Sequence, residues 1–295
     1  MKQGKNENLT GVLFVLPAII GFVAFSAGPM IASFILSFTN YTIIKPVEFI
    51  GLRNYLEFFR GQDTFFYNSI KVTVLFAIMN VIVCIGVAFT IALILNNKKI
   101  KGLPLLRAVF YVPTIVPIIA TAMIYMWMMS PDFGVFNAIL RNFSIPPGKW
   151  IYSEKSVLPS LLFMTAWCSG NIMVVFLAGL QGIPKQLYEA IMIDGGNVFI
   201  KFQHVTLPMM TPTIFFNMVM FFISSMQAFL QAYIMTQGGP NNSTNFIVYY
   251  LYRQAFEFGE VGKANTLGWI LFIMIVSVSA LLFWSSKFWV LYGDE

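Results

Sequence analysis

Charged side chains are scarce in this sequence. Asp, Glu, Lys and Arg make up 10% of its 295 residues, whereas 58% are hydrophobic and 17% aromatic. A soluble domain usually carries about 25% charged residues, because its surface faces water. The apolar residues also form six long blocks, and a helix needs about 20 such residues to cross a bilayer. We therefore expect lipid to be the main solvent of this chain.

The middle of each block contains no Asp, Glu, Lys, Arg or His. Proton- and ion-coupled transporters usually depend on ionisable residues inside the membrane. Their absence argues against a self-sufficient pump or proton symporter. It also favours an uncharged solute, because a charged solute would need a counter-charge in the low dielectric of the membrane.

Catalytic and nucleotide-binding motifs are missing as well. The single histidine is His204, and the sequence contains no HExxH, no GxSxG and no acid pair at metal-ligand spacing. It also contains no GxxxxGK(S/T), so it does not cradle a nucleotide phosphate by that route. We expect no enzymatic activity, no metal and no cofactor bound by this chain, and we expect another subunit to supply energy for uphill transport.

Cysteine content and net charge carry little functional information. Cys84 and Cys168 lie inside apolar blocks without a CxxC partner, which is typical of small core residues. The net charge of +6 comes from bases scattered between the blocks rather than from a basic stripe. Nucleic acid is therefore not an expected partner.

The six blocks are expected to be transmembrane helices, because lipid offers no partners for backbone N–H and C=O groups. They cover residues 11–38, 69–96, 107–130, 157–182, 208–236 and 264–288. The first block is too long for a cleavable signal peptide, so we interpret it as a retained span. This gives an N-terminal segment 1–10, a transmembrane domain 11–290 and a C-terminal tail 291–295.

An even number of spans places both termini on one side of the membrane. Lys and Arg are equally numerous on the two faces, but the densest basic cluster lies in the short loop 97–107. Charge density next to the ends of spans weighs heavily in the positive-inside rule. We therefore expect both termini and the loops 97–107 and 183–207 to be cytoplasmic.

The most informative stretch runs from Ile183 to Pro212. Pro184 is expected to open a short helix, where its missing N–H costs nothing. The sequence Asp194-Gly195-Gly196-Asn197 ends that helix, because glycine readily adopts the left-handed conformation. A second amphipathic segment follows from Val198. The pattern predicts a helix–turn–helix on the membrane surface with apolar residues free for a partner, although a pair that contacts only lipid headgroups would show the same pattern.

This stretch closely resembles the coupling loop of ABC importer permeases, whose E-A-A-x-x-x-D-G-A motif is followed by L-P. It differs from the motif at Ile191 and Gly196. The resemblance extends to F-I-G-L-R-N-Y (49–55), P-D-F-G-V-F-N-A-I-L (131–140), Q-G-G-P-N-N-S-T (237–244) and Y-L-Y-R-Q-A-F (250–256). This set resembles sugar permeases of the maltose-transporter type, and the G-G-P segment is similar to the first of the two permeases in such systems.

The resemblance implies an all-α membrane protein with six transmembrane helices, in the type I ABC importer permease architecture with a cytoplasmic coupling helix pair. It implies that the loop docks into a cleft of an ATPase subunit. Glu189 would face basic groups of the ATPase, and Gly195 would form a sharp turn braced by Asp194. The residues implied to fix the packing of the loop are Tyr188, Ala190, Leu207 and Pro208.

The implied partners are a second homologous permease, two cytoplasmic ATPase subunits and an extracytoplasmic solute-binding protein. ATP and Mg would be used by the ATPase rather than by this chain. Transport of a neutral sugar, expected to be an oligosaccharide, would proceed by alternating access. The resemblance implies the cytoplasmic (inner) membrane of a bacterium or archaeon as the location, with membrane lipid around the spans.

A neutral sugar is best bound by hydroxyl and amide groups together with an aromatic face. Such groups lie near the middle of the fourth and fifth blocks, which line the substrate cavity in maltose-type permeases. The candidates are Trp167, Asn171, Phe221, Ser224, Ser225, Gln227 and Gln231, with Ser169 and Asn217 nearby. Trp167 and Asn171 are the preferred pair. Hydrogen bonding from helix to helix is the alternative role for each polar member.

Three other functions fit part of the sequence. An ABC permease for another small solute, such as glycerol phosphate or a polyamine, is disfavoured by the uncharged spans. A stand-alone secondary transporter is disfavoured because the middles of the spans contain no ionisable groups. A membrane enzyme is disfavoured because the sequence contains no catalytic motif.

Overall fold

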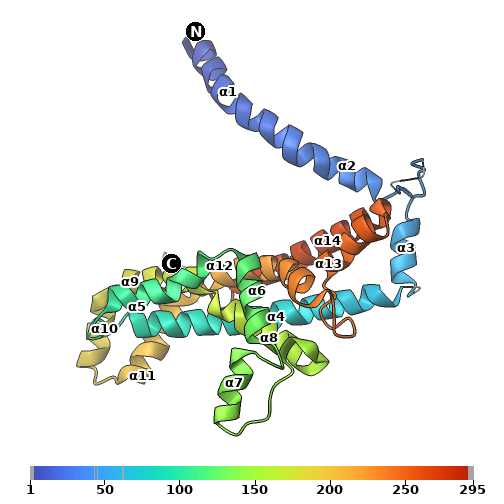
Figure 1. The fold of residues 1–295 in the computed structure, drawn as a ribbon. Helices are drawn as coiled ribbons and strands as arrows, with labels where there is room; N and C mark the ends of the chain where they lie inside the picture. The colour runs from blue at the N-terminus through green and yellow to red at the C-terminus, as the bar shows by residue number, and fades with distance from the viewer. Residues whose placement is uncertain (1–2, 43, 45, 62, 292–295) are drawn as a thin grey trace. The chain divides into compact units, whose positions relative to one another are not determined.

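The computed structural model describes the backbone of residues 3–42, 44, 46–61 and 63–291, and side chains from residue 11 onward. Most of the predicted tail, residues 292–295, lies outside the described residues, as do residues 1 and 2. The described chain is almost entirely helical, with a single antiparallel β-bridge between Thr39 and Phe49. Figure 1 shows the order of the helices along the chain. The prediction of an all-α protein is confirmed.

The chain divides into two compact units, which are described separately. The first contains residues 1–63 and 251–272, and the second contains residues 64–250 and 273–295. Two helices belong partly to each unit: α13 (Ile247–Tyr252) and α14 (Val261–Ser286).

In the first unit, one long helical path precedes a short helix. The path consists of α1 (Gln3–Phe22), the π-helical turn η1 (Val23–Ala27) and α2 (Gly28–Leu36). The short helix is α3 (Arg53–Phe59). The π-helical turn η6 (Arg253–Glu257), which follows α13, also belongs to this unit. Pro29 stands at the start of α2. Because proline has no N–H, it removes one helical hydrogen bond. The π-helical turn η1 lies just before it, where the α-helical hydrogen bonding is interrupted. Pro29 therefore accounts for the irregular turn in the first predicted span.

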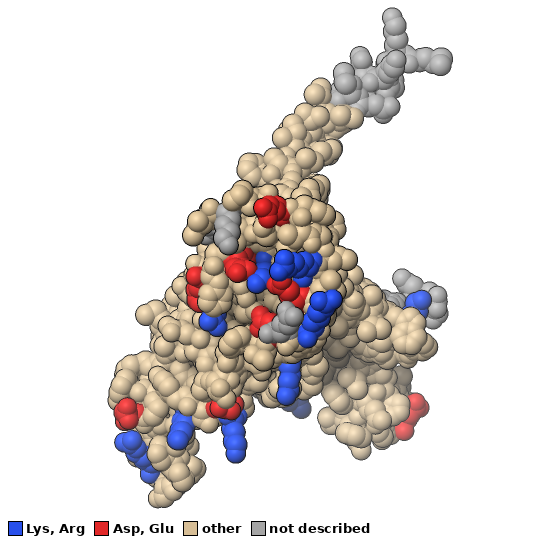
Figure 2. Space-filling model, turned by 90° about the vertical axis from the view of Figure 1, so that its right-hand side faces the viewer, with Lys and Arg blue, Asp and Glu red and all other residues tan. Residues whose placement is uncertain are grey.

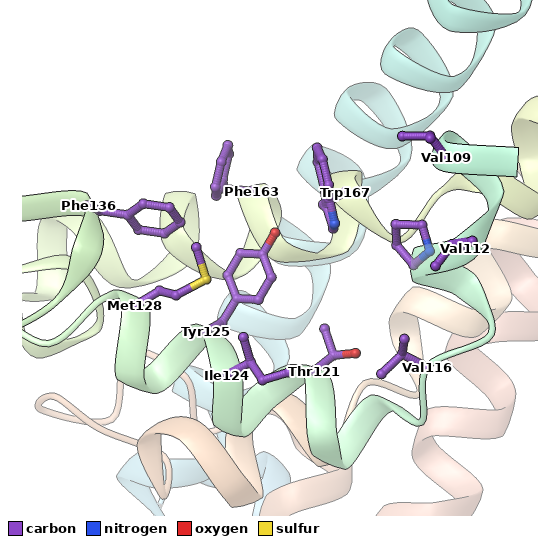
Figure 3. Close-up of a pocket in the computed structure, with 11 residues that line it drawn as sticks. Val109, Val112, Val116, Thr121, Ile124, Tyr125, Met128, Phe136, Phe163 and Trp167 are labelled. Carbon is purple, nitrogen blue, oxygen red and sulfur yellow. The ribbon is translucent and has the colours of Figure 1, made fainter. Parts of the chain in front are cut away.

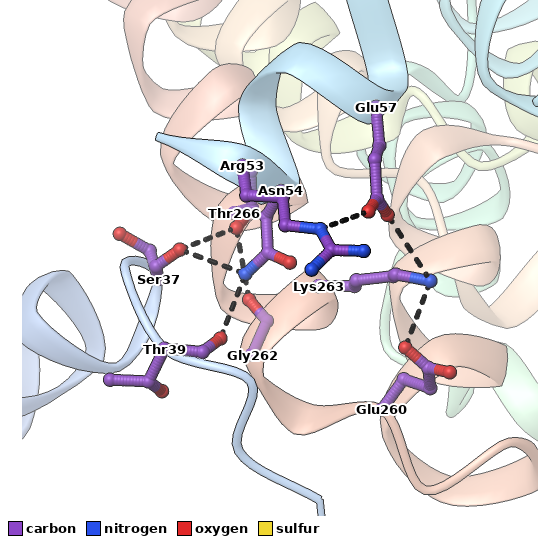
Figure 4. A network of polar contacts seen from close by, with 9 residues as sticks. All are labelled: Ser37, Thr39, Arg53, Asn54, Glu57, Glu260, Gly262, Lys263 and Thr266. Atoms are coloured by element: carbon purple, nitrogen blue, oxygen red, sulfur yellow. Dashed lines mark hydrogen bonds and ion pairs between the residues drawn. The ribbon is translucent and has the colours of Figure 1, made fainter. Parts of the chain in front are cut away.

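A buried asparagine joins the end of α2 to its neighbours (Figure 4). Asn54 donates from Nδ2 to the backbone oxygens of Ser37, at 3.1 Å, and of Thr39, at 2.9 Å. The hydroxyl of Thr266 on α14 donates to the same Ser37 oxygen at 3.0 Å. A Cβ at Gly262 would lie 2.2 Å from the Thr39 oxygen, so only glycine fits there. The last carbonyls of a helix need outside partners, and here α3 and α14 supply them.

Ion pairs surround this joint but are exposed to different degrees. Arg53 Nε lies 3.0 Å from Glu57, and Lys263 Nζ lies 3.6 Å from Glu57 and 3.0 Å from Glu260. The Arg53 side chain is 72% exposed, and exposed ion pairs contribute little to stability. On the face drawn in Figure 2, charged side chains form a few groups among uncharged residues. The buried amide of Asn54 is therefore the stronger element of the joint.

The second unit is built around α4 (Thr64–Leu95), which packs against α8, α9 and α12. Its other elements are α5 (Leu103–Tyr111), η2 (Val112–Thr114), α6 (Ile118–Met128), α7 (Val135–Asn142), η3 (Trp150–Tyr152), α8 (Glu154–Trp167), α9 (Gly170–Gly182), α10 (Lys185–Ile193), α11 (Val198–Lys201), η4 (Phe202–Thr206), α12 (Leu207–Met226) and η5 (Ala232–Thr236).

Four helices of the described chain are long and apolar enough to cross a membrane. They are Gly11–Leu36, Thr64–Leu95, Val198–Met226 and Val261–Ser286. Two further pairs pass the same criterion but are bent: Leu103–Thr114 with Ile118–Met128 by 94°, and Glu154–Trp167 with Gly170–Gly182 by 52°. By length and composition this gives up to six spans.

The bends have local causes. Pro117 adopts an extended ψ of 135° just before α6, and proline cannot continue the hydrogen bonding of the preceding helix. At the second bend, a Cβ on Gly170 would lie 2.3 Å from the Phe110 oxygen, so α9 starts in close contact with the backbone of α5. The predicted fifth block is also interrupted, because α12 ends at Met226 and helix resumes only before η5.

We predict that Asn54→Ala destabilises the protein by about 2 kcal/mol, because two buried backbone oxygens lose a donor. The measurement is the free energy of unfolding, or the Tm, of the purified subunit in detergent. Asn40→Ala is the control, since its bonds to Glu48 are exposed. Equal effects of the two substitutions would contradict the role assigned to Asn54.

Candidate functional site

The helix predicted after Pro184 is α10, and its end has the geometry of a glycine cap. Gly195 has a φ of +78° and its N–H donates to the Met192 oxygen at 3.2 Å. The N–H of Gly196 donates to the Ile191 oxygen at 2.8 Å. This pair of bonds defines the Schellman motif, in which a left-handed residue lets the chain turn away from the helix axis. The turn expected at Asp194-Gly195 is therefore present.

The second helix of the pair is continuous with the next span. Asn197 caps α11, because its Oδ1 accepts the Ile200 N–H at 3.0 Å. From there α11, η4 and α12 form one helical path from Val198 to Met226. Pro208 stands in the first turn of α12, where proline is tolerated. The predicted boundary before Pro208 is therefore wrong, because the helix runs through this residue without a break.

The two departures from the family motif fit each other. A Cβ added at Gly196 would lie 2.3 Å from Cγ2 of Ile191 and 2.9 Å from the Ile191 oxygen. The larger side chain at 191 thus fills the space that a side chain at 196 would need. A large residue at one position is accommodated by the absence of a side chain at the other.

One hydrogen bond joins the two helices of the pair. The hydroxyl of Tyr188 lies 3.0 Å from that of Thr206, and Tyr188 is half-buried. Glu189, Ala190 and Asp194 are exposed, so they are available to a partner. Of the other predicted coupling residues, Leu207 is exposed and Pro208 is half-buried.

The turn between the helices also carries exposed apolar side chains. Ile193 is 86%, Val198 81% and Phe199 68% exposed, with Met192 next to them. A group of large exposed apolar residues beside charged ones is typical of a protein interface. We call these four residues the apolar turn patch.

Other segments lie at the same end of the second unit. A cavity of about 880 Å³ is lined by Leu93, Asn96, Asn97, Leu180, Tyr188, Val198, Phe199, Lys201, Phe202 and Thr206. The N–H of Leu291 donates to Thr211 Oγ1 at 3.0 Å, and the Trp289 ring contacts Phe215. The end of α4, the α10–α11 pair and the end of the described chain therefore lie together.

One candidate from the fourth span and one from the fifth lie at a similar depth. A Cβ on Gly179 of α9 would be 3.0 Å from Thr213 Oγ1 of α12, so the two helices pass each other there. The helices follow opposite directions, and each residue advances 1.5 Å. Asn171 is eight positions before Gly179, and Phe221 is eight positions after Thr213. Asn171 and Phe221 are thus level with each other.

Exposure separates the candidate solute residues into two groups. Trp167, Asn171, Ser224 and Gln227 are exposed, whereas Phe221 and Gln231 are half-buried. Ser169 is buried.

Four candidates form hydrogen bonds inside the protein, and for Gln227 and Ser169 the acceptors are the backbone oxygens of Ile223 and Ala166. Ser225 is buried and its hydroxyl accepts from Asn80 Nδ2 at 2.9 Å. Asn217 is buried and donates to the Thr213 oxygen of its own helix. For Ser225 and Asn217, the alternative of a role within the helix bundle agrees with the structure.

Trp167 lines a cavity of about 520 Å³ between the bent α5–α6 pair and α8 (Figure 3). The lining residues are Val109, Val112, Pro113, Val116, Thr121, Ile124, Tyr125, Met128, Phe136, Phe163 and Trp167. Its polar groups include the Tyr125 and Thr121 hydroxyls and the Trp167 indole N–H. Asn171, Ser224 and Gln227 are not part of this lining, so the structure does not gather all candidates in one pocket.

Tyr125 and Phe163 were missed by the sequence analysis. Figure 3 shows Tyr125 and Phe163 beside Trp167 around the same space, and the Tyr125 and Phe163 rings are 6.1 Å apart. The prolines that cause the bend were visible in the sequence, but the face on which the bend opens was not. Within the described residues, no three His, Cys, Asp or Glu side chains are grouped so that they could hold a metal ion.

We predict that Gly196→Ala destabilises the protein by about 1–3 kcal/mol, the usual cost of overpacking. Adding Ile191→Ala should recover part of this loss, because it removes the methyl group that the new Cβ meets. The Tm of the purified single and double variants measures this coupling. Gly182→Ala is the control, since a Cβ there meets nothing within 4 Å. Strictly additive effects would show that residues 191 and 196 are independent.

Known proteins with similar sequences share nearly the whole chain. A family described as "Binding-protein-dependent transport system inner membrane component" matches residues 88–289. The chain is 38% identical to the probable ABC transporter permease protein YesP of Bacillus subtilis, over 99% of this chain and 94% of that protein. It is 31% identical to the trehalose/maltose transport system permease protein MalF of Thermococcus litoralis, over 92% and 91%.

The fold has solved counterparts. A chain of a bacterial alginate ABC transporter, crystallised with a periplasmic protein bound to an alginate pentasaccharide, superposes with a TM-score of 0.85 at 21% identity, covering 97% of each chain. The predicted permease fold is therefore confirmed. This chain belongs to the family of inner-membrane components of binding-protein-dependent transport systems, and it is a permease subunit of an ABC transporter.

Proposed function

We propose that this permease imports a neutral sugar, in the size range of an oligosaccharide, by alternating access. The observation that carries the proposal is the presence of exposed polar and aromatic side chains beside two helix interruptions. Trp167 and Asn171 flank the break between α8 and α9, while Ser224 and Gln227 lie at the end of α12. All four are uncharged, and hydroxyl, amide and ring groups suit a sugar.

The names of relatives support a sugar as the solute. Besides the trehalose/maltose permease, they include arabinooligosaccharide permeases of Bacillus subtilis and Halalkalibacterium halodurans. Glycerol phosphate and polyamines carry charges, and the uncharged middles of the spans offer no counter-charge for them.

The α10–α11 pair is the proposed contact with a cytoplasmic ATPase. It presents Glu189 and Asp194 to basic groups, and the apolar turn patch to an apolar cleft. Two ATPase subunits would bind ATP and Mg, so this chain needs no cofactor. Since α11, η4 and α12 are continuous, movement of the pair is carried directly to Ser224.

The remaining partners follow from the same arrangement. A second, homologous permease would complete the pathway, and an extracytoplasmic solute-binding protein would deliver the sugar at the end opposite the α10–α11 pair. The end of α4 and residues 289–291 lie on the side of the pair, which supports a cytoplasmic location for the loop 97–107 and the C-terminus. The N-terminus is proposed to lie on the same side.

The first test is purification and reconstitution. A tagged chain should copurify with a second permease and with an ATPase that carries GxxxxGK(S/T). Proteoliposomes of this complex, given its solute-binding protein and ATP, should accumulate at least one of radiolabelled trehalose, maltose and arabino-oligosaccharide, but not glycerol 3-phosphate. Accumulation by the chain alone, without nucleotide, would refute the proposal.

The second test concerns the solute residues. We predict that Asn171→Ala and Ser224→Leu each lower the uptake rate about tenfold, which corresponds to ~1.4 kcal/mol, because one removes a hydrogen-bonding amide and the other narrows the site. Radiolabelled sugar uptake by the reconstituted complex measures the effect. Asn142→Ala, at an exposed position of α7, is the control. Wild-type uptake in both variants would remove this site from the proposal.

A further inference from the structure

A buried polar cluster connects three helices in the second unit. Asn80 of α4 is 4% exposed. Its Nδ2 donates to the Ser225 hydroxyl of α12 at 2.9 Å, and its Oδ1 accepts from the Thr165 hydroxyl of α8 at 2.6 Å. The Cys84 thiol of α4 approaches the same Oδ1 at 3.2 Å. Both ends of the Asn80 amide are therefore used, one for each neighbouring helix.

The two helices that Asn80 holds, α8 and α12, both end at the interruptions beside which the exposed solute residues lie. Thr165 precedes Trp167, the last residue of α8, by two positions. Ser225 is adjacent to Ser224 and precedes the end of α12 at Met226. Each hydrogen bond thus lies within one turn of an interruption. Asn80 itself is buried and faces its two partners rather than the exposed side chains.

Nothing else of this kind links the same two ends among the hydrogen bonds of the described residues. Asn217, a buried asparagine on α12, bonds only to the Thr213 oxygen of its own helix. In lipid there is no hydrophobic driving force between helices, so interhelical hydrogen bonds and close packing hold them together. A hydrogen bond also fixes the relative position of two helices, which apolar packing alone would allow to slide. A buried polar network in which every group is hydrogen-bonded also favours one arrangement of the helices over similar alternatives.

We propose that Asn80 is a positioning residue that sets the separation between the α8–α9 break and the end of α12, and with it the width of the solute site. This inference rests on the proposed function, because it assigns that separation to sugar binding. Asn80 acts through Thr165 and Ser225 and does not touch the solute. The width of the site therefore depends on a third helix, α4, that contributes no exposed solute residue.

The experiment uses the complete importer, reconstituted with its partners, and two measurements. The first is sugar accumulated per ATP hydrolysed, with whichever of radiolabelled trehalose, maltose and arabino-oligosaccharide the wild type imports. The second measurement needs no sugar. It is the rate at which N-ethylmaleimide alkylates a cysteine introduced by Ser224→Cys or Asn171→Cys. Peptide mass spectrometry follows the reaction, so that alkylation of Cys84 and Cys168 is counted separately.

Thr165→Val is the main variant, because valine keeps the shape of threonine and removes only the hydroxyl. It should lower sugar accumulated per ATP about fivefold, the size expected for one buried hydrogen bond, and change the alkylation rate at position 171 or 224 by a similar factor. Thr165→Ser, which keeps the hydroxyl, should restore both values. Asn80→Leu should have a larger effect, and adding Thr165→Val to it should cause little further change.

Asn217→Leu is the matched control, since it removes a buried amide from α12 without touching α8, and it should leave both alkylation rates unchanged. Unchanged alkylation in an assembled Thr165→Val or Asn80→Leu importer would overturn the inference, as would equal effects of Thr165→Val and Thr165→Ser. If Asn171→Ala and Ser224→Leu transport normally while Thr165→Val still changes alkylation, the proposed solute site fails but Asn80 retains its positioning role.

Discussion

A helix that is interrupted inside a bilayer leaves backbone groups without water to bind, and this constraint shapes the second unit. The α8–α9 break is covered by a neighbour, because the start of α9 lies so close to the Phe110 oxygen that only glycine fits at position 170. The Asn80 network holds the helix ends on either side of the site. The irregular backbone at these breaks is tolerated because packed helices surround it. It can therefore present exposed polar side chains.

The all-helical class, the apolar blocks and the turn at Asp194-Gly195 could be predicted from the sequence. Length and the lack of charge determine the first two, and glycine's access to positive φ determines the third. The resemblance supplied the architecture and the family. Both kinds of evidence are local or statistical, and neither depends on which helix faces which.

The arrangement of the candidate site could be predicted only in part. Mid-span position identified Trp167, Asn171 and Ser224, but it also selected Ser225, which is buried against Asn80. One residue along a helix is a rotation of about 100°, so neighbours in sequence face different surroundings. The fit between Ile191 and Gly196 was likewise invisible, because the sequence shows two separate departures and the structure shows one shared volume.

The unbroken path from Val198 to Met226 has a mechanical consequence. Its 29 residues span about 44 Å at 1.5 Å per residue. A rod of that length acts as a lever: tilting it by about 10° around one end shifts the other end by roughly 7–8 Å. A small rotation imposed at the surface turn is thus converted into a displacement comparable to the width of a sugar ring, without any change in the internal structure of the helix.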